Sequence, residues 1–281
     1  MSNDPPQPVA GAAATATETA GSPALLTVHE LAKDFGGLRA VDKCSFDVAE
    51  GSITGLIGPN GAGNTTVFNV VTGFHRPDGG QVVFAGEDIT GLPPHQVFRR
   101  GLCRTFQIPR EHHSMTVLEN LMLVPKEQLG ERGYNNLARR PSVRGQERDN
   151  RRKALEVLSF LDLKDLAGEF AGNLSGGQKK LLELARTLMT DPRMVLLDEP
   201  AAGVNPTLLV GIAGQIGQLR RERNLTFLVI EHDMNLVMSL CDTVVVMSGG
   251  SRLAAGPPSV IREDPRVLEA YLGGQYGALE R

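Results

Sequence analysis

The sequence has few cysteines, no excess of basic residues and no long apolar run. Its three cysteines, Cys44, Cys103 and Cys241, lie far apart without a CxxC pair, which excludes the usual zinc-ligand spacings and favours reduced, structural thiols. The formal net charge is -3, so we expect no nucleic acid partner. No stretch of about 18 residues is apolar and uncharged, which predicts that any membrane contact comes through a partner protein.

The first 24 residues are also poor in charge and in large apolar side chains. Asp4 and Glu18 are their only charged residues, and Ala, Thr, Pro and Gly are abundant. This composition predicts a flexible tail over residues 1–24. A secretory signal needs a basic start followed by an apolar stretch, and this segment has neither, so we expect no such signal.

The remaining residues, 25–281, alternate between strand and helix patterns. With 281 residues, of which 41% are hydrophobic, the chain is long enough to bury a large core. Apolar strand patterns such as MVLLDEP and LTFLVIEHD flank the helix pattern PTLLVGIAGQIGQLRRER, which predicts an α/β fold with a largely parallel sheet. Segments with helical spacing also predict an α-helical subdomain over about residues 107–190.

A glycine-rich loop follows the apolar run SITGLI and precedes a helix pattern. Its spacing is G-x-x-x-x-G-x-[ST], and in this context glycines let successive backbone N–H groups turn toward phosphate oxygens. Thr65 would supply a hydroxyl to Mg²⁺. The loop therefore predicts a set of nucleotide-binding residues, namely Gly58, Pro59, Asn60, Gly61, Ala62, Gly63, Asn64, Thr65 and Thr66.

One position departs from this P-loop pattern, because Asn64 stands where Lys is expected. The missing ammonium would reach the β- and γ-phosphates, and a charge-assisted hydrogen bond of this kind contributes about 1.5–3 kcal/mol. Asn is neutral and too short to replace it. Its loss corresponds to about one to two powers of ten in affinity, so we predict that this chain's own P-loop site is impaired.

Two acidic residues end the apolar pattern MVLLD. Asp198 can hold Mg²⁺, and Glu199 can polarise an attacking water, which makes Glu199 a candidate catalytic residue. An acidic strand end is an ordinary structural feature by itself. This prediction therefore depends on the glycine-rich loop that precedes it in the sequence.

A second glycine-rich segment, LSGGQ, precedes the helix pattern KKLLELARTLM and can present backbone N–H groups to another phosphate. Its candidate phosphate-binding residues are Ser175, Gly176, Gly177 and Gln178. The segment resembles the signature of the ABC ATPase family, in which the signature of one subunit closes over the nucleotide held by the P-loop of another. The resemblance implies ATP and Mg²⁺ as cofactors, and a hetero- or homodimer with a second ATP-binding cassette.

Further positions match motifs of this family in the expected order. Gln107 in RTFQ matches the Q-loop, which senses Mg²⁺ and water, and His232 in VIEHD matches the switch histidine that contacts the γ-phosphate. Phe35 resembles the aromatic residue that stacks on adenine, although a Phe at a strand end is often part of the core. The resemblance thus implies Gln107, Glu199 and His232 as catalytic residues, and Thr65, Gln107 and Asp198 as metal ligands.

The resemblance covers about residues 25–275 and implies an α/β fold, with a P-loop NTPase (RecA-like) core, a small antiparallel β subdomain and an inserted α-helical subdomain. FGGLRAV, TVLEN and DPRVLEAYLG look like segments of the subunits of branched-chain and hydrophobic amino acid importers. This similarity implies membrane-spanning permease subunits as partners. It also implies a peripheral position on the cytoplasmic face of the cell inner membrane.

Three interpretations of function remain open. The first is an ATPase subunit that couples ATP hydrolysis to solute import. The second is a degenerate, non-hydrolysing subunit with a structural or regulatory role, which Asn64 supports, whereas the presence of Glu199 and His232 argues against it. The third is a soluble ABC protein of translation or DNA repair, which is less favoured because such proteins usually have two cassettes in one chain or long inserted arms.

Overall fold

The computed structural model describes residues 23–105, 111–125 and 140–276. Within this part of the chain, one sheet is antiparallel throughout. Its strands are β1 (Ala24–Phe35), β2 (Leu38–Ala49), β4 (Gly79–Phe84) and β5 (Glu87–Asp88). They lie in the order β2-β1-β4-β5, so the N-terminal hairpin forms one side of this sheet.

A six-stranded sheet forms the centre of the molecule. Its strands are β3 (Ile53–Ile57), β6 (Leu102–Arg104), β7 (Met194–Asp198), β8 (Thr226–Ile230), β9 (Thr243–Ser248) and β10 (Ser251–Gly256). In the order β10-β9-β3-β8-β7-β6, only the β9–β10 pair is antiparallel among the described strands. Parallel neighbours bring the carboxyl ends of β3, β7 and β8 to the same edge, which is where ligands bind in such sheets.

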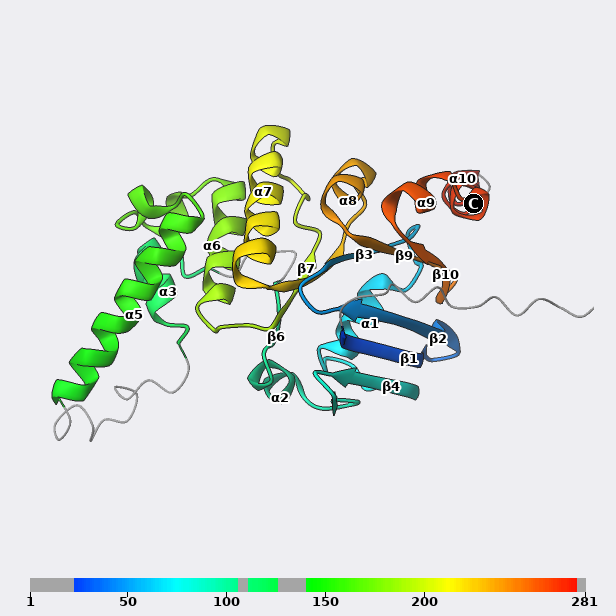
Figure 1. Ribbon diagram of the computed structural model, residues 1–281, viewed down its shortest axis with the longest axis horizontal. Helices are drawn as coiled ribbons and strands as arrows, with labels where there is room; N and C mark the ends of the chain where they lie inside the picture. The colour runs from blue at the N-terminus through cyan, green and yellow to red at the C-terminus, as the bar shows by residue number, and fades with distance from the viewer. Residues whose placement is uncertain (1–22, 106–110, 126–139, 277–281) are drawn as a thin grey trace, which may run out of the picture.

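Helices connect the strands and cover the central sheet. They are α1 (Asn64–Val71), α2 (Pro94–Arg99), α3 (Val117–Met122), α5 (Arg140–Phe160), α6 (Gly176–Leu188), α7 (Pro206–Arg223), α8 (Met234–Leu240), α9 (Pro258–Glu263) and α10 (Pro265–Tyr276), with short 3-10 turns at Lys164–Leu166 and Ala171–Asn173. In Figure 1, α3 and α5 lie at one end of the molecule and α9 and α10 at the other. None of the helices in the described ranges has both the length and the apolar character needed to cross a membrane.

The apolar core is divided by the central sheet. On β8, Phe227 and Val229 pack in a cluster with the helices α3, α5, α6 and α7, whereas Leu228 and Ile230 pack in a second cluster with the antiparallel sheet and α1. Because successive side chains of a strand point to opposite faces, a strand buried on both faces must be apolar throughout. This explains the continuous apolar runs that predict the buried strands.

The run SFDVAEGSITGLIG belongs to two strands in different sheets. A turn at Glu50 and Gly51 separates β2 of the antiparallel sheet from β3 of the central sheet.

The predicted helical subdomain, about residues 107–190, contains α3, α5 and α6 in its described part. The predicted tail, residues 1–24, lies outside the described residues up to residue 22, and β1 begins at Ala24.

Candidate functional site

A cleft of about 470 Å³ opens at the carboxyl ends of the central strands. It is formed by the ends of β1 and β2, the loop between β3 and α1, and the residues that follow β7 and β8. The lining residues are Phe35, Leu38, Arg39, Ala40, Pro59, Asn60, Gly61, Ala62, Gly63, Asn64, Thr65, Thr66, Glu199, Ile230 and His232. The structure therefore brings most of the predicted P-loop together with Phe35, Glu199 and His232, although they lie far apart in the sequence.

The loop between β3 and α1 depends on glycine at its last position. Gly63 precedes the first residue of α1 and has a φ of 103°, a conformation that L side chains rarely adopt. A Cβ at this position would lie 2.5 Å from the carbonyl oxygen of Ala40, so a side chain does not fit. The Gly63 carbonyl accepts the Val67 N–H at 2.9 Å, which starts the helix directly behind the loop. The amide groups at this helix start are thus available to an anion in the cleft.

Asn64 is the first residue of α1 and is only 6% exposed. Within the described residues, its Oδ1 has no hydrogen-bond partner. A buried acceptor without a partner costs about 1–3 kcal/mol, and ionised phosphate oxygens, which are acceptors themselves, cannot supply the missing donor. The position that should carry a cation thus carries a neutral, incompletely paired side chain.

Phe35 stands at the end of β1 and lines the cleft with a ring that is 42% exposed. Its ring meets the His75 ring edge to face, with centroids 5.2 Å apart. The Phe is therefore not part of the buried core, and an exposed aromatic face beside a phosphate-binding loop can stack on a planar base. Its role in adenine binding stays a prediction.

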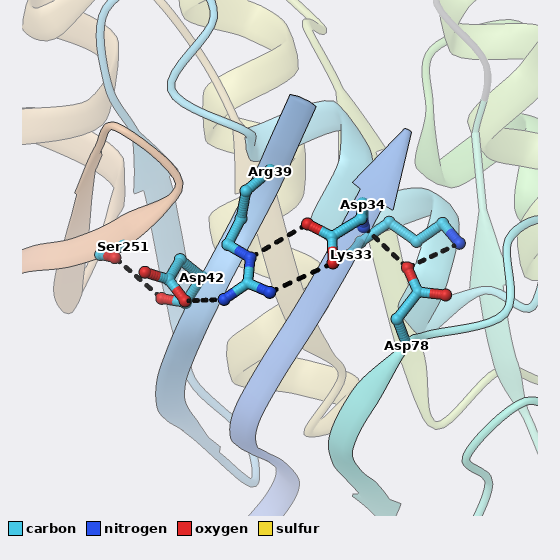
Figure 2. A network of polar contacts seen from close by, with 6 residues as sticks. All are labelled: Lys33, Asp34, Arg39, Asp42, Asp78 and Ser251. Atoms are coloured by element: carbon cyan, nitrogen blue, oxygen red, sulfur yellow. Dashed lines mark hydrogen bonds and ion pairs between the residues drawn. The ribbon is translucent and has the colours of Figure 1, made fainter. Parts of the chain in front are cut away.

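Arg39 is a second rim residue of the cleft and belongs to a polar network that Figure 2 shows. Its Nε donates to Asp34 Oδ1 at 3.0 Å, its Nη1 donates to Asp42 Oδ1 at 3.1 Å, and the Ser251 hydroxyl donates to the Asp42 carbonyl at 2.8 Å. The network joins β1 and β2 to β10. The charge of the Arg39 guanidinium is thus compensated by two carboxylates at the edge of the cleft.

Glu199 and His232 lie next to each other at the ends of β7 and β8. The distance between Glu199 Oε1 and His232 Nε2 is 3.1 Å, and the side chains are 22% and 47% exposed. Both line the cleft with the P-loop. A carboxylate in contact with an imidazole at this position can accept a proton from a water molecule that attacks a bound phosphate.

Asp198, one residue earlier, is paired with an arginine that sequence reasoning missed. Arg104 Nη2 lies 2.5 Å from Asp198 Oδ2, and Arg104 Nη1 donates to Asn69 Oδ1 of α1 at 2.6 Å. The Arg104 and Asp198 side chains are 8% and 10% exposed. Breaking such a buried pair by removing one partner is strongly destabilising. The motif RTFQ contains the signal, since its arginine stands three residues before Gln107.

Gln107 lies outside the described residues, so its predicted place beside the cleft stays a prediction. The second glycine-rich segment lies apart from the cleft lining and starts α6. Ser175 caps this helix, since its Oγ accepts the Gln178 N–H at 3.3 Å and its own N–H donates to Gln178 Oε1 at 2.9 Å. Ser175 and Gly176 are exposed, which leaves this helix start open to a ligand held by another subunit.

The described residues contain no group of three or more His, Cys, Asp or Glu side chains that could hold a metal ion by themselves. Of the three residues predicted for Mg²⁺, Thr65 and Asp198 lie in the described ranges and Gln107 does not. The Thr65 hydroxyl and the Asp198 carboxylate are oxygen donors of the kind that Mg²⁺ prefers. Mg²⁺ usually takes one or two protein oxygens and completes its shell with phosphates and water. Thr65 lines the cleft, whereas Asp198 is not among the lining residues and its Oδ2 is paired with Arg104, so of these two donors Thr65 is the one that faces the nucleotide space.

Comparison with known proteins gives consistent similarities in sequence and structure. Residues 41–202 match the family model described as ABC transporter, and residues 251–277 match that of the branched-chain amino acid ATP-binding cassette transporter. The high-affinity branched-chain amino acid transport ATP-binding protein BraF of Pseudomonas aeruginosa is 45% identical over 249 residues, which cover 89% of this chain and 98% of that protein.

A probable branched-chain amino acid transport ATP-binding protein, LivG of Archaeoglobus fulgidus, is 43% identical over 256 residues, which cover 91% of this chain and 98% of that protein. Among solved structures, the ADP conformation of an ATP-binding cassette of an ABC transporter has a TM-score of 0.77 and 38% identity, covering 90% of this chain and 100% of that chain. These similarities confirm the predicted fold class.

Proposed function

The chain belongs to the ABC transporter family of ATPases, and on this premise we propose that it is the ATP-binding subunit of an importer for branched-chain or other hydrophobic amino acids. The observation that carries the substrate class is the match of residues 251–277 to the branched-chain amino acid cassette model. Relatives that match almost end to end carry the same transport description in their names, which supports the proposal.

We infer the following roles for the cleft residues. The Phe35 ring stacks on adenine, and the backbone N–H groups of the loop from Gly58 to Thr65 surround the phosphates. Glu199 Oε1 accepts the proton of the attacking water, and His232 holds the Glu199 carboxylate in place and contacts the γ-phosphate. Thr65 and Asp198 would hold Mg²⁺, which supplies neutralisation of phosphate charge when bound.

The finer proposal is that this chain's own P-loop site is impaired while its signature segment is intact. Asn64 cannot supply the charge that a Lys gives to the β- and γ-phosphates. Ser175, Gly176 and Gly177 would face the P-loop of a second cassette, and that second site would keep its own lysine if the partner is a different chain. Membrane-spanning permease subunits would hold the pair peripherally at the cytoplasmic face of the membrane.

A second candidate is a degenerate subunit that binds nucleotide weakly and regulates an assembly without hydrolysing ATP. The buried, incompletely paired amide of Asn64 favours it. The close contact between Glu199 and His232 favours the first candidate, because this pair can accept the proton of an attacking water, a step that a non-hydrolysing subunit does not need.

Reconstitution tests the proposal. The chain would be co-expressed with the permease and cassette partners that co-purify with it and inserted into vesicles, and ATP-driven uptake of labelled leucine and of labelled arginine would be measured. We expect leucine uptake that requires this chain, with little arginine uptake. Uptake of neither solute, with the multi-spanning partner absent from the purified complex, would contradict a transport function.

A further inference from the structure

A buried carboxylate lies beneath the Glu199 and His232 pair. Glu231 follows β8 and is only 3% exposed. Its Oε1 accepts the N–H of Ala201 at 2.5 Å, and its Oε2 accepts the N–H of His232 at 3.0 Å. One side chain therefore joins the loop that follows Glu199 to the loop that carries His232. Hydrogen bonds from backbone amides to a carboxylate are charge-assisted, so they hold both loops firmly.

A lysine holds the same region from another side. Lys180 lies on the second turn of α6, and its Nζ donates to the carbonyl oxygens of Glu199 at 2.9 Å and Pro200 at 3.1 Å. Burial lowers the pKa of Lys180, whereas the negative charges of Glu231, Glu183 and Glu199 act in the opposite direction. The lysine is thus a partly desolvated donor whose ammonium is bound to the backbone of the loop that carries Glu199.

The backbone of Glu199 shows why such support is needed. Its φ is +49°, a left-handed conformation that is strained for a residue other than glycine. Strain of this kind persists only where the surroundings fix it. Here the Glu199 N–H donates to Ile230 O at 3.0 Å, and Lys180 binds its carbonyl. Together with the hydrogen bond from the Ala201 N–H to Glu231, these contacts fix the backbone position of Glu199 and hence the position from which its side chain extends.

We propose that Lys180 and Glu231 are positioning residues that hold Glu199 and His232 in the arrangement needed for ATP hydrolysis. Neither residue lines the cleft, so they act through the two loops and not on the substrate. Lys180 belongs to α6, the helix that begins at the signature segment. It therefore connects the segment that would face the partner's nucleotide with Glu199 of this chain's own site. The inference rests on the proposed function for its catalytic consequence.

The first test is hydrogen exchange measured on the full chain without nucleotide. In Glu231→Gln and Lys180→Met, we expect exchange in peptides that cover residues 199–204 and 231–235 to rise at least about tenfold, because a tenfold rise corresponds to losing about one hydrogen bond of support. Lys179→Met is the matched control, since Lys179 is the neighbouring residue and pairs with Glu111 at 3.0 Å. Unchanged exchange in both test variants would overturn the proposal.

The second test measures ATP turnover in the assembled transporter, in an Asn64→Lys background where this chain's site is expected to be active and the partner cassette's own site has been inactivated. Lys180→Met and Glu231→Gln should lower kcat about tenfold with the MgATP Kd unchanged, and Lys180→Arg should restore most of the activity. A fall in affinity that matches the fall in kcat, or no rescue by Arg, would contradict a positioning role. If Glu199→Gln had no effect in this background, the proposed function of this site would fail, while the exchange test would still decide the inference.

Discussion

The two glycine-rich segments of this chain both start helices, and they differ in what their side chains supply. Before α6, Ser175 and Gln178 cap the helix reciprocally, with N···O distances of 2.9 and 3.3 Å. Before α1, no side chain caps the helix, and the Asn64 Oδ1 is buried without a hydrogen-bond partner in the described part of the chain. The signature segment is therefore complete, whereas the P-loop lacks one side chain.

The difference shows that backbone shape and charge are separable parts of a phosphate site. The P-loop keeps its shape because Gly63 holds a φ of 103° that no other residue fits beside Ala40. Its charge depends on one side chain, and Asn64 does not provide it. We therefore expect this chain to bind a phosphate of its own poorly while serving the nucleotide of a partner normally.

The largest effect is expected from blocking the signature segment, Ser175 to Gln178. Gly176 is exposed, and a Cβ there would meet no atom within 4 Å, so Gly176→Asp adds a carboxylate without a clash. This charge would repel a phosphate from the start of α6. ATP hydrolysis by the assembled transporter should fall about 100-fold, the scale of losing a preorganised anion-binding group. Gly177 is less suitable, because its Cβ would lie 1.9 Å from Leu208 Cδ2.

Two controls decide this prediction. Gly214→Asp, at another exposed helix position with open space around its Cβ, should leave hydrolysis unchanged. Glu199→Gln should also change it little, because Glu199 serves the site that contains Asn64. If Glu199→Gln instead removed all turnover, catalysis would run through the Asn64 site, and the difference between the two segments would have no functional meaning.

The next effect is expected from restoring the missing charge. Asn64→Lys should tighten MgATP binding by about 10- to 100-fold, because a charge-assisted hydrogen bond contributes about 1.5–3 kcal/mol. Calorimetry on the isolated chain measures this directly. Asn64→Gln is the control, since it lengthens the side chain without adding charge and should bind as weakly as the unchanged chain. Equal affinities for the unchanged chain and its Asn64→Lys variant would mean that the asparagine is tolerated.

The local parts of this candidate site are predicted from short motifs. A phosphate loop, a helix start and an acidic strand end are each written in a few consecutive residues, so Gly58 to Thr66, Ser175 and Asp198 can be named from motifs alone. Parallel strand order then brings Glu199 and His232 together, because both follow adjacent strands of one sheet. Their contact at 3.1 Å depends on the pairing of β7 with β8, which the strand patterns alone do not specify.

The supporting contacts could not be predicted in the same way. Arg104 and Asp198 are separated by 94 positions, and Lys180 meets Glu199 from a different element, 19 positions earlier. Periodicity shows which face of an element is buried, but it does not show which polar group meets which across the core. Glu231 could not be predicted for another reason. It stands beside His232 in VIEHD, and this motif by itself indicates only the histidine. The position of Gln107 remains a prediction.

The smallest effect is expected from Ser175→Ala, which tests whether the signature segment contributes to catalysis in addition to starting its helix. Ser175→Ala removes a cap, which costs about 1 kcal/mol of stability. Thr116→Ala is a matched control, because Thr116 caps α3 with the same reciprocal contacts to Glu119. In a protein of this size both changes should lower the Tm by about 2–4 °C.

Only Ser175→Ala should also lower hydrolysis. A hydroxyl that accepts the Gln178 N–H still has its hydrogen to donate, so Ser175 can cap the helix and bind a phosphate oxygen together. Losing a hydrogen bond to a charged group should reduce turnover of the assembled transporter by about tenfold. The contrary result would be that Ser175→Ala and Thr116→Ala lower the Tm by the same amount and have the same turnover. The signature segment would then only start a helix, and its difference from the P-loop would be one of local stability alone.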